Sequence, residues 1–495
     1  MRPKRRKRLW ASLVVIASLL STPTTSLAQD SEGKSQDERI KELEAQNQEL
    51  EKRLSDLEAK GSEPKAAGED AEDQQKADQA AEKARGMTPE QRQTLKEGLA
   101  ASQPANYNAA WQIGTPKKYV VDKGWWGLKG TPSELRLSGW VQFALFHDFQ
   151  GNALPTKQLF SSGAVIVPTV KRPSTGVDVA SSRIFLEFRH LFDWKQKRKN
   201  FPGVTHMLFE MDMGGDLIDD GLGPRVRQFF AQIGHLTFGQ ADSAFANGGT
   251  WPAYFDRAAP GAYPEVRRAV LRYAAALSKR QMKHAHVLTA GIEQPRAEFA
   301  NAESAFNAPD MLVRYDYSPK WGNLMAAVIV RYFVAESTTT DARATKWTAG
   351  GTFTGWATIP TKNEDRLKWN FLIGPGVSGL MQDTSIAGGL DGTYVDATNT
   401  LLTTNAWGIW AGWERPWADQ WNSLFMLSYV DVLNVAGQAP DTFSSSITAT
   451  ATLDCEPVSH LFIAVEYFYG RRVNFDAQFG QDHRLNLALR FMINR

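Results

Sequence analysis

The sequence predicts an all-β protein: a 16-stranded antiparallel transmembrane β-barrel with an N-terminal periplasmic coiled-coil helix. Segments of about ten residues in which apolar and polar side chains alternate recur from residue 135 to the C-terminus. Short and long connections alternate between these segments. After the first twenty residues, the 495-residue chain contains no apolar segment long enough for a spanning helix. Together these patterns favour a membrane protein that spans with strands.

Composition argues against several other classes of protein. The 56 Lys and Arg residues nearly balance the 54 Asp and Glu residues, so no global field favours nucleic acid as a partner. The single Cys cannot form an internal disulfide, and no spacing typical of a zinc site is present. We therefore expect neither a cofactor nor a metal, and no catalytic residue.

Residues 1–28 are predicted to be a secretory signal peptide. Six basic side chains among the first eight residues precede an apolar run over residues 9–20, and Ser26-Leu27-Ala28 provides a cleavage site with small residues. The alternative is an uncleaved anchor, but the apolar run is shorter than the ~20 residues that span a bilayer. We expect an exported protein of the bacterial outer membrane.

Residues 29–60 are predicted to form a coiled-coil stalk in the periplasm. Positions at heptad spacing carry mainly large apolar side chains, which makes them oligomerisation contacts; they are Ile40, Leu43, Asn47, Leu50, Leu54 and Leu57. Asn47 at an a position would fix the register of the assembled helices. A single solvated helix is the alternative. Residues 61–134 are predicted to be a linker with one short helix.

Residues 135–495 are predicted to form the barrel. The first seven strands are expected to begin near Leu135, Ser182, Val204, Arg225, Leu236, Val266 and Ala285. Short turns are expected near residues 318–322, 360–365, 415–420 and 454–459, and long loops near residues 148–180, 214–224, 242–265, 294–309, 335–346, 381–405, 432–442 and 471–483. The total number of predicted strands is sixteen, and an even number of strands returns the chain to the periplasmic side.

Several segments resemble the DcaP-like outer-membrane porins. They are Phe238-Gly239-Gln240, residues 310–317 with Trp321-Gly322, Asp365-Arg366-Leu367-Lys368 before Gly374, and residues 465–472 with Asn474 and Asp476. The resemblance extends over most of residues 135–495 and includes the stalk. It implies a homotrimer held by barrel walls and coiled coil, surrounded by outer-membrane lipid, that passes small anionic solutes, dicarboxylates in particular.

Arginines on the inner strand faces are the candidates for selectivity, because a guanidinium pairs bidentately with carboxylates and stays charged. A barrel of sixteen strands has a lumen too wide for wall side chains to fill, and sixteen-stranded porins fold the loop after the fifth strand inward. Strand parity and this loop select Arg183, Arg257, Arg268, Arg272, Arg314, Arg331, Asp256 and Glu210 as pore-lining residues. For each arginine, a salt bridge that stiffens the wall is the alternative.

The sequence thus favours a passive channel for small anions. The alternatives are a phosphate-selective channel, which would present a ladder of lysines, and a non-conducting barrel that anchors the stalk to the cell wall. A barrel enzyme would need Ser, His and an acidic residue together at one rim, and no such spacing is legible.

Overall fold

The computed structural model describes residues 124–128, 131, 133–191, 204–215, 223–277, 285–418 and 420–493. The predicted signal peptide, the stalk with Ile40, Leu43, Asn47, Leu50, Leu54 and Leu57, and most of the linker lie outside the described residues. Among the described residues, no helix is long and apolar enough to cross a membrane.

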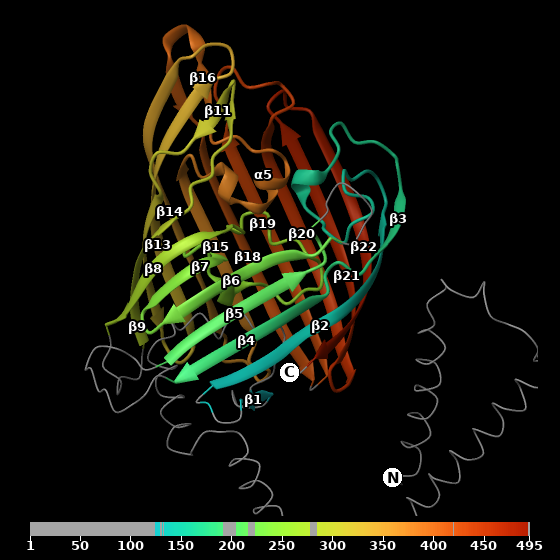
Figure 1. Ribbon diagram of the computed structural model, residues 1–495. Helices are drawn as coiled ribbons and strands as arrows, with labels where there is room; N and C mark the ends of the chain where they lie inside the picture. The colour runs from blue at the N-terminus through green and yellow to red at the C-terminus, as the bar shows by residue number, and fades with distance from the viewer. Residues whose placement is uncertain are drawn as a thin grey trace, which may run out of the picture. The chain divides into compact units, whose positions relative to one another are not determined.

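Sixteen strands form one closed antiparallel barrel (Figure 1). In chain order they are β2 (Ser133–Asp148), β4 (Arg183–Leu191), β5 (Val204–Asp212), β6 (Arg225–Ile233), β7 (Leu236–Asp242), β8 (Arg267–Ala276), β9 (Ala285–Glu293), β12 (Asp310–Ser318), β13 (Gly322–Ser337), β14 (Arg343–Thr358), β15 (Arg366–Pro375), β18 (Asn405–Ala418), β19 (Trp421–Leu433), β20 (Phe443–Val458), β21 (Leu461–Asn474) and β22 (Phe479–Ile493). Each pairs with the next, and β22 pairs with β2 from Gly139↔Ile493 to Asp148↔Arg484. The predicted number of strands and antiparallel closure are confirmed.

The connections carry smaller elements. They are β1 (Trp125–Gly127), η2 (Ser162–Ala164), β3 (Ser174–Asp178), η3 (Gly248–Thr250), β10 (Phe299–Ala300), β11 (Ala302–Ala305), η4 (Ser378–Leu380), α5 (Gln382–Ile386), β16 (Gly392–Val395), η5 (Asp396–Thr398) and β17 (Thr400–Thr403). Strand β1 falls within the range predicted as linker and pairs with the start of β2, where Trp126 lies opposite Leu135.

Two predicted long loops are wrong. In place of a loop over residues 335–346, β13 and β14 continue their ladder to Glu336↔Arg343, leaving residues 338–342 as the hairpin connection. In place of residues 471–483, β21 and β22 pair out to Val473↔Phe479. The polar composition of these segments does not prevent pairing, because cross-strand partners such as Arg343 and Glu336 form an ion pair.

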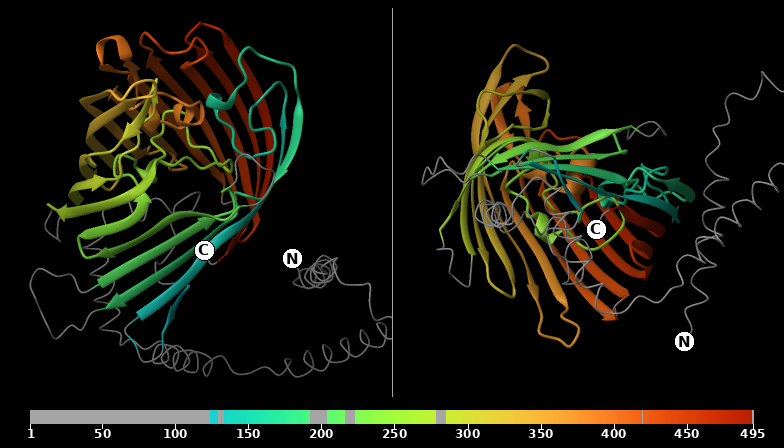
Figure 2. Two further views of the ribbon diagram at one scale, coloured as in Figure 1. Left: turned by 45° about the horizontal axis from the view of Figure 1, so that its top comes forward. Right: turned by 60° about the horizontal axis from the view of Figure 1, so that its bottom comes forward.

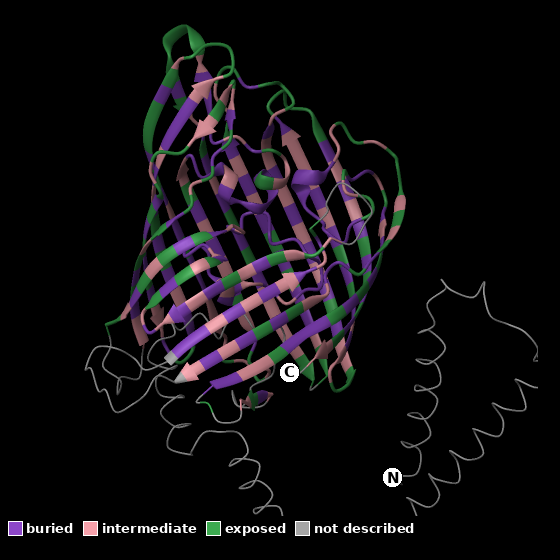
Figure 3. Ribbon diagram, in the orientation of Figure 1, coloured by how far each residue is buried: buried purple, intermediate pink, exposed green. Residues whose placement is uncertain are grey.

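The faces of the barrel are inverted relative to a water-soluble protein (Figure 3). On β12, Met311, Val313 and Tyr315 are exposed on the outside, whereas Arg314 and Asp316 are buried inside. Most of the other strands show the same alternation. An apolar outer surface of this extent requires lipid or another protein chain against it.

The wall is uneven in height. The six consecutive strands β4 to β9 contain 7 to 10 residues each, whereas β13, β14, β20 and β22 contain 15 or 16. The shorter strands form a low wall, and its inner face carries most of the charged groups of the site.

Candidate functional site

The loop after the fifth barrel strand folds into the lumen, as predicted. We call residues 243–266 the inward loop. Asn247 Nδ2 donates to Asn323 Oδ1 of β13 at 2.9 Å, and the Phe255 backbone N–H donates to the Glu466 carboxylate of β21 at 2.7 Å. The Ala262 N–H donates to Ser428 Oγ of β19 at 3.0 Å. The inward loop is therefore held along the tall wall, across the lumen from β4 to β8.

A charged pair holds the tip of the inward loop. The Glu414 carboxylate of β18 accepts hydrogen bonds from Lys368 Nζ and from the Ala253 N–H, each at 2.7 to 2.8 Å. Lys368 Nζ also donates to the Trp251 carbonyl at 2.7 Å. These bonds involve ionised groups in a buried setting, so each is stronger than a neutral hydrogen bond.

Arg314, one of the predicted pore-lining residues, is an anchor of the inward loop. Its guanidinium donates to both oxygens of Asp316, at 2.7 and 2.9 Å. Its Nη1 also donates to the carbonyls of Ala244 and Ala246, at 3.2 and 2.7 Å. This guanidinium is committed to protein acceptors.

Arg268 and Arg331 are also committed to the protein. They share Asp310, whose Oδ2 lies 2.5 Å from Arg268 Nη1 and 3.2 Å from Arg331 Nε. Arg331 donates further to the carbonyls of Gly376 and Arg296, at the ends of two loops. Both guanidinium groups are buried. Arg272 is half-buried on the inner face of β8 and donates to the Asp242 carbonyl at 3.1 Å.

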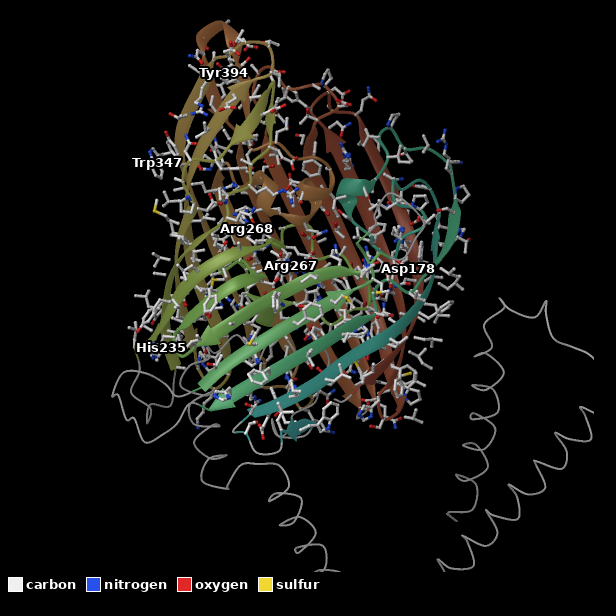
Figure 4. All side chains as sticks on the ribbon, in the orientation of Figure 1. Asp178, His235, Arg267, Arg268, Trp347 and Tyr394 are labelled. Atoms are coloured by element: carbon white, nitrogen blue, oxygen red, sulfur yellow. The ribbon has the colours of Figure 1, made fainter. Side chains whose placement is uncertain are left out.

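Arg183 and Glu210 form an ion pair of 3.0 Å on the inner face of the low wall. They belong to a larger set that we call the charged wall: Arg183, Glu210, Asp212, Arg225, Arg227, Asp242, Glu265 and Arg267. Arg225, Asp242 and Arg267 keep 35%, 41% and 19% of their side-chain surface exposed. Figure 4 shows Arg267 beside Arg268 on β8, at mid-height in the barrel.

The sequence prediction missed Arg225, Arg227 and Arg267. The register of β5 and β6 shifts between Glu210 and Met211, which leaves Arg227 as an additional residue without a direct partner. Such a bulge breaks the strict alternation on which a parity argument depends. The sequence feature that could have identified these residues is the pair of arginines at alternate positions, Arg225 and Arg227.

Asp256 and Arg257 lie side by side on the inward loop but differ in their contacts. Asp256 Oδ1 accepts from the backbone N–H groups of Phe160 and Ala258, at 3.0 and 2.8 Å. Burial raises the pKa of the Asp256 carboxyl, and Arg484 opposes this shift. Asp256 therefore fixes the backbone of two loops.

Arg257 is buried without a hydrogen-bond acceptor for its guanidinium among the described residues. Its side chain is 3% exposed, and the closest paired carboxylate oxygen, Asp178 Oδ2, lies 3.9 Å away. Both Asp178 oxygens already accept backbone N–H groups, from Gln158 and Ala180. Gly214 lies against the guanidinium, since a Cβ there would be 2.5 Å from Nη1. Burial lowers the pKa of Arg257, and Asp178 opposes this.

Within the part of the chain that the structure describes, no group of three or more His, Cys, Asp or Glu side chains is arranged to hold a metal ion. The site offers guanidinium and carboxylate groups on the inner face of the barrel, so the interactions available to it are electrostatic.

Comparisons with known proteins agree with this fold. A family model described as DcaP outer membrane protein matches residues 176–493. The outer membrane channel DcaP of Acinetobacter baumannii is similar in structure, with a TM-score of 0.62 and 15% sequence identity, over 73% of this chain and 97% of that chain. No curated protein sequence matches the chain.

Two further solved structures are similar at a lower level. The anion-selective porin from Comamonas acidovorans has a TM-score of 0.47 and 8% identity, over 73% of this chain and 100% of that chain. The trimer form of OmpT of Vibrio cholerae has a TM-score of 0.43 and 12% identity, over 73% of this chain and 99% of that chain. Because the family model matches more than half of the sequence and the barrel closes with sixteen strands, the chain belongs to the DcaP family of outer membrane proteins.

Proposed function

We propose that the protein is a passive, homotrimeric outer-membrane channel for small anionic solutes, dicarboxylates among them. The observation that carries this proposal is Arg257, a buried guanidinium on the inward loop whose nitrogens have no acceptor in the described residues. A buried charge without acceptors is costly, and a passing carboxylate supplies acceptors in the planar geometry that a guanidinium fits.

The predicted pore-lining set divides by the acceptors of each arginine. All guanidinium nitrogens of Arg314 and Arg331 donate to protein oxygens, and Arg268 Nη1 donates to Asp310 and to the Gln294 carbonyl, so we assign these three arginines a structural role. Arg183 and Arg257 remain as candidates for solute contact, and the half-buried arginines of the charged wall, Arg225 and Arg267, join them. The mixed signs of the charged wall favour a transverse field over the lysine ladder of a phosphate-selective channel.

Features of the outer surface support the trimer. The low wall presents exposed apolar side chains, among them Ile184, Leu186, Phe229 and Leu271, on strands that are shorter than β13, β14, β20 and β22. A second barrel packed there would cover this surface. The stalk predicted from residues 29–60 would join the same three chains in the periplasm after removal of the signal peptide.

Reversal potentials in planar bilayers under a KCl gradient test the channel and its selectivity. We expect anion preference in the wild type, and a shift towards zero in Arg257→Ala because one fixed positive charge leaves the constriction. Arg296→Ala is the matched control, since the Arg296 side chain is exposed and forms an ion pair with nearby Glu298, which is also exposed. Absence of current, or cation preference, would overturn the proposal.

The alternative of a wall anchor makes a different prediction. Deleting residues 31–86 should abolish trimers but preserve current if the stalk serves assembly. Retained trimers with lost contact to the cell wall would favour an anchor instead. The two outcomes are separated by gel filtration in detergent and by bilayer conductance of the same preparation.

A further inference from the structure

A second loop enters the lumen beside the inward loop. We call residues 149–182 the first loop, and its segment 157–165 is buried throughout. Arg484 Nη1 of β22 donates to the Lys157 carbonyl at 2.9 Å, and Gln142 Nε2 of β2 donates to Gln158 Oε1 at 2.7 Å. The segment precedes residue 176, where the family match begins.

A third loop meets both of them. We call residues 376–404 the helical loop, because it contains α5. The Gln382 N–H donates to the Tyr263 carbonyl, and the Asp383 N–H donates to the Gly261 carbonyl, both at 3.1 Å. These bonds join α5 to the inward loop. In Figure 2 the short helix η2 of the first loop lies beside α5, whereas β3 of the same loop lies at the edge of the barrel, where it pairs with β2.

Asp383 of the helical loop bonds to both other loops and to the wall: its backbone N–H bonds to the inward loop, and its carboxylate bonds to the first loop and to β20. Asp383 Oδ1 accepts from Ser161 Oγ of the first loop at 2.6 Å. Asp383 Oδ2 accepts from Ser446 Oγ at 2.7 Å and from Thr448 Oγ1 at 3.4 Å, both on β20. Residue Asp383 is 1% exposed, so these contacts exclude water.

Two glycines allow the loops to approach this carboxylate. A Cβ at Gly163 of the first loop would lie 2.0 Å from the Asp383 carbonyl oxygen. A Cβ at Gly261 of the inward loop would lie 2.2 Å from Asp383 Oδ2. Neither distance is compatible with a side chain, so the junction requires glycine on both neighbouring loops.

We propose that Asp383 is a positioning residue that joins the first, inward and helical loops into one composite constriction, and thereby sets the size limit of the channel. The inference rests on the proposed channel function. In this arrangement the inward loop alone does not define the narrow region, because the first loop occupies part of the lumen and Asp383 fixes its turn at Ser161 against the helical loop.

The chemistry of the junction supports positioning over simple packing. Among the described residues no cation forms an ion pair with Asp383, and its carboxylate oxygens accept from hydroxyl groups of two separate elements. A buried carboxylate contributes little net stability compared with apolar packing, because its desolvation is costly. What such a group does provide is a defined arrangement of its donors.

The test compares Asp383→Ala with Asp383→Asn. The alanine variant loses every side-chain acceptor, so the turn of the first loop at Ser161 is no longer bonded to the helical loop. Single-channel conductance should then rise roughly two-fold, with larger polyethylene glycols now able to enter the lumen. The asparagine variant keeps an acceptor and gains a donor, and the hydroxyl groups can rotate to match it. It should restore the wild-type conductance and size limit.

Asp396→Ala is the matched control, since Asp396 lies in the same loop but is exposed, and its carboxylate accepts from Ser337 Oγ. Heat-dependent gel mobility reports whether each barrel has folded. If Asp383→Ala does not fold, the pair Ser161→Ala and Ser446→Ala breaks the same contacts one at a time, with Ser445→Ala as control on the opposite face of β20.

The outcomes separate the two proposals. If the wild type carries no current, the channel function itself fails. If the wild type conducts and folded Asp383→Ala, or both serine variants, keep its conductance and size limit, the composite constriction is overturned while the channel function stands. If Asp383→Asn behaves like Asp383→Ala, the composite constriction is also overturned, because the hydrogen-bond geometry of the side chain, without its charge, should be sufficient to position the loops.

Discussion

At the scale of single residues, the inner arginines fall into two classes that differ in their acceptors. Arg314 has protein oxygens for its donors, whereas the guanidinium of Arg257 has none among the described residues. Parity along a strand predicts that a side chain faces the lumen, but it does not predict which oxygens surround that side chain. Asp310 shows why, since it joins Arg268 and Arg331 from strands far apart in sequence.

Removal of Arg314 should therefore destabilise the barrel. Arg314→Ala removes the buried ion pair with Asp316 and frees the start of the inward loop, at a cost of about 3–5 kcal/mol. Urea unfolding from lipid bilayers measures this change. Arg343→Ala, which breaks an exposed ion pair with Glu336, should cost about 0–1 kcal/mol in the same assay. Equal costs for the two variants would contradict the anchor role.

The protonation of Asp383 should be visible in the pH dependence of stability. Burial raises the pKa of Asp383, and hydrogen bonds from Ser161 and Ser446 oppose this only in part. The folded-state pKa thus exceeds the unfolded value of about 3.9, so the stabilisation is complete below that value and is lost as the pH rises through the folded-state pKa. Tyr254, a titratable neighbour, has a pKa well above the usual tyrosine range and stays neutral.

Asp383→Asn cannot ionise and provides the reference for this prediction. The stability of the wild type relative to Asp383→Asn should fall as the pH is raised from 4 towards neutrality, measured as the difference in urea midpoint. Asp396→Asn, at an exposed site, should show no such trend. If the stability of the wild type relative to Asp383→Asn instead rises with pH, burial does not dominate the pKa of Asp383.

At the scale of elements, the sequence predicted the strands more closely than the positions and contacts of the loops. Alternation placed the starts of β5, β6, β7 and β9 at the observed residues, because a strand in a barrel wall repeats one pattern over many positions. Segment 157–165 of the first loop has no such repeating pattern. It is held by Asp256, Asp383 and Arg484, which lie about 95 to 330 residues further along the chain, so local sequence could not predict its position.

The tip of the inward loop offers a test of how firmly this element is held. Glu414→Ala removes the acceptor of the Ala253 N–H and the charge partner of Lys368. We expect more frequent current fluctuations in single-channel records, since the loop tip loses one bond to the wall and Lys368, which binds the Trp251 carbonyl, loses its charge partner. Glu303→Ala, at an exposed position of β11, should leave the records unchanged. A steady current in Glu414→Ala would show that the remaining contacts suffice.

At the scale of the whole molecule, barrel closure was predictable because an even strand count returns the last strand to the first, and β22 does pair with β2. What the sequence could not show is how full the lumen is. The largest apolar cluster lies inside the barrel and combines wall residues such as Trp410 and Val430 with loop residues such as Phe245 and Met381. Its members come together only after the loops fold inward.

The inverted surface predicts a depth-dependent cost for charge on the outside of a single strand. Leu427 and Leu433 both face outward on β19 and are similarly exposed, but Leu427 lies in the middle of the strand and Leu433 at its end. If β19 faces lipid, Leu427→Arg should lower the free energy of unfolding from bilayers by about 2–4 kcal/mol and Leu433→Arg by about 0–1 kcal/mol. Equal costs would contradict this, since only a hydrocarbon layer distinguishes the two positions by depth. A water-facing strand would tolerate both substitutions, so the pair of variants identifies the surroundings of this wall without reference to transport.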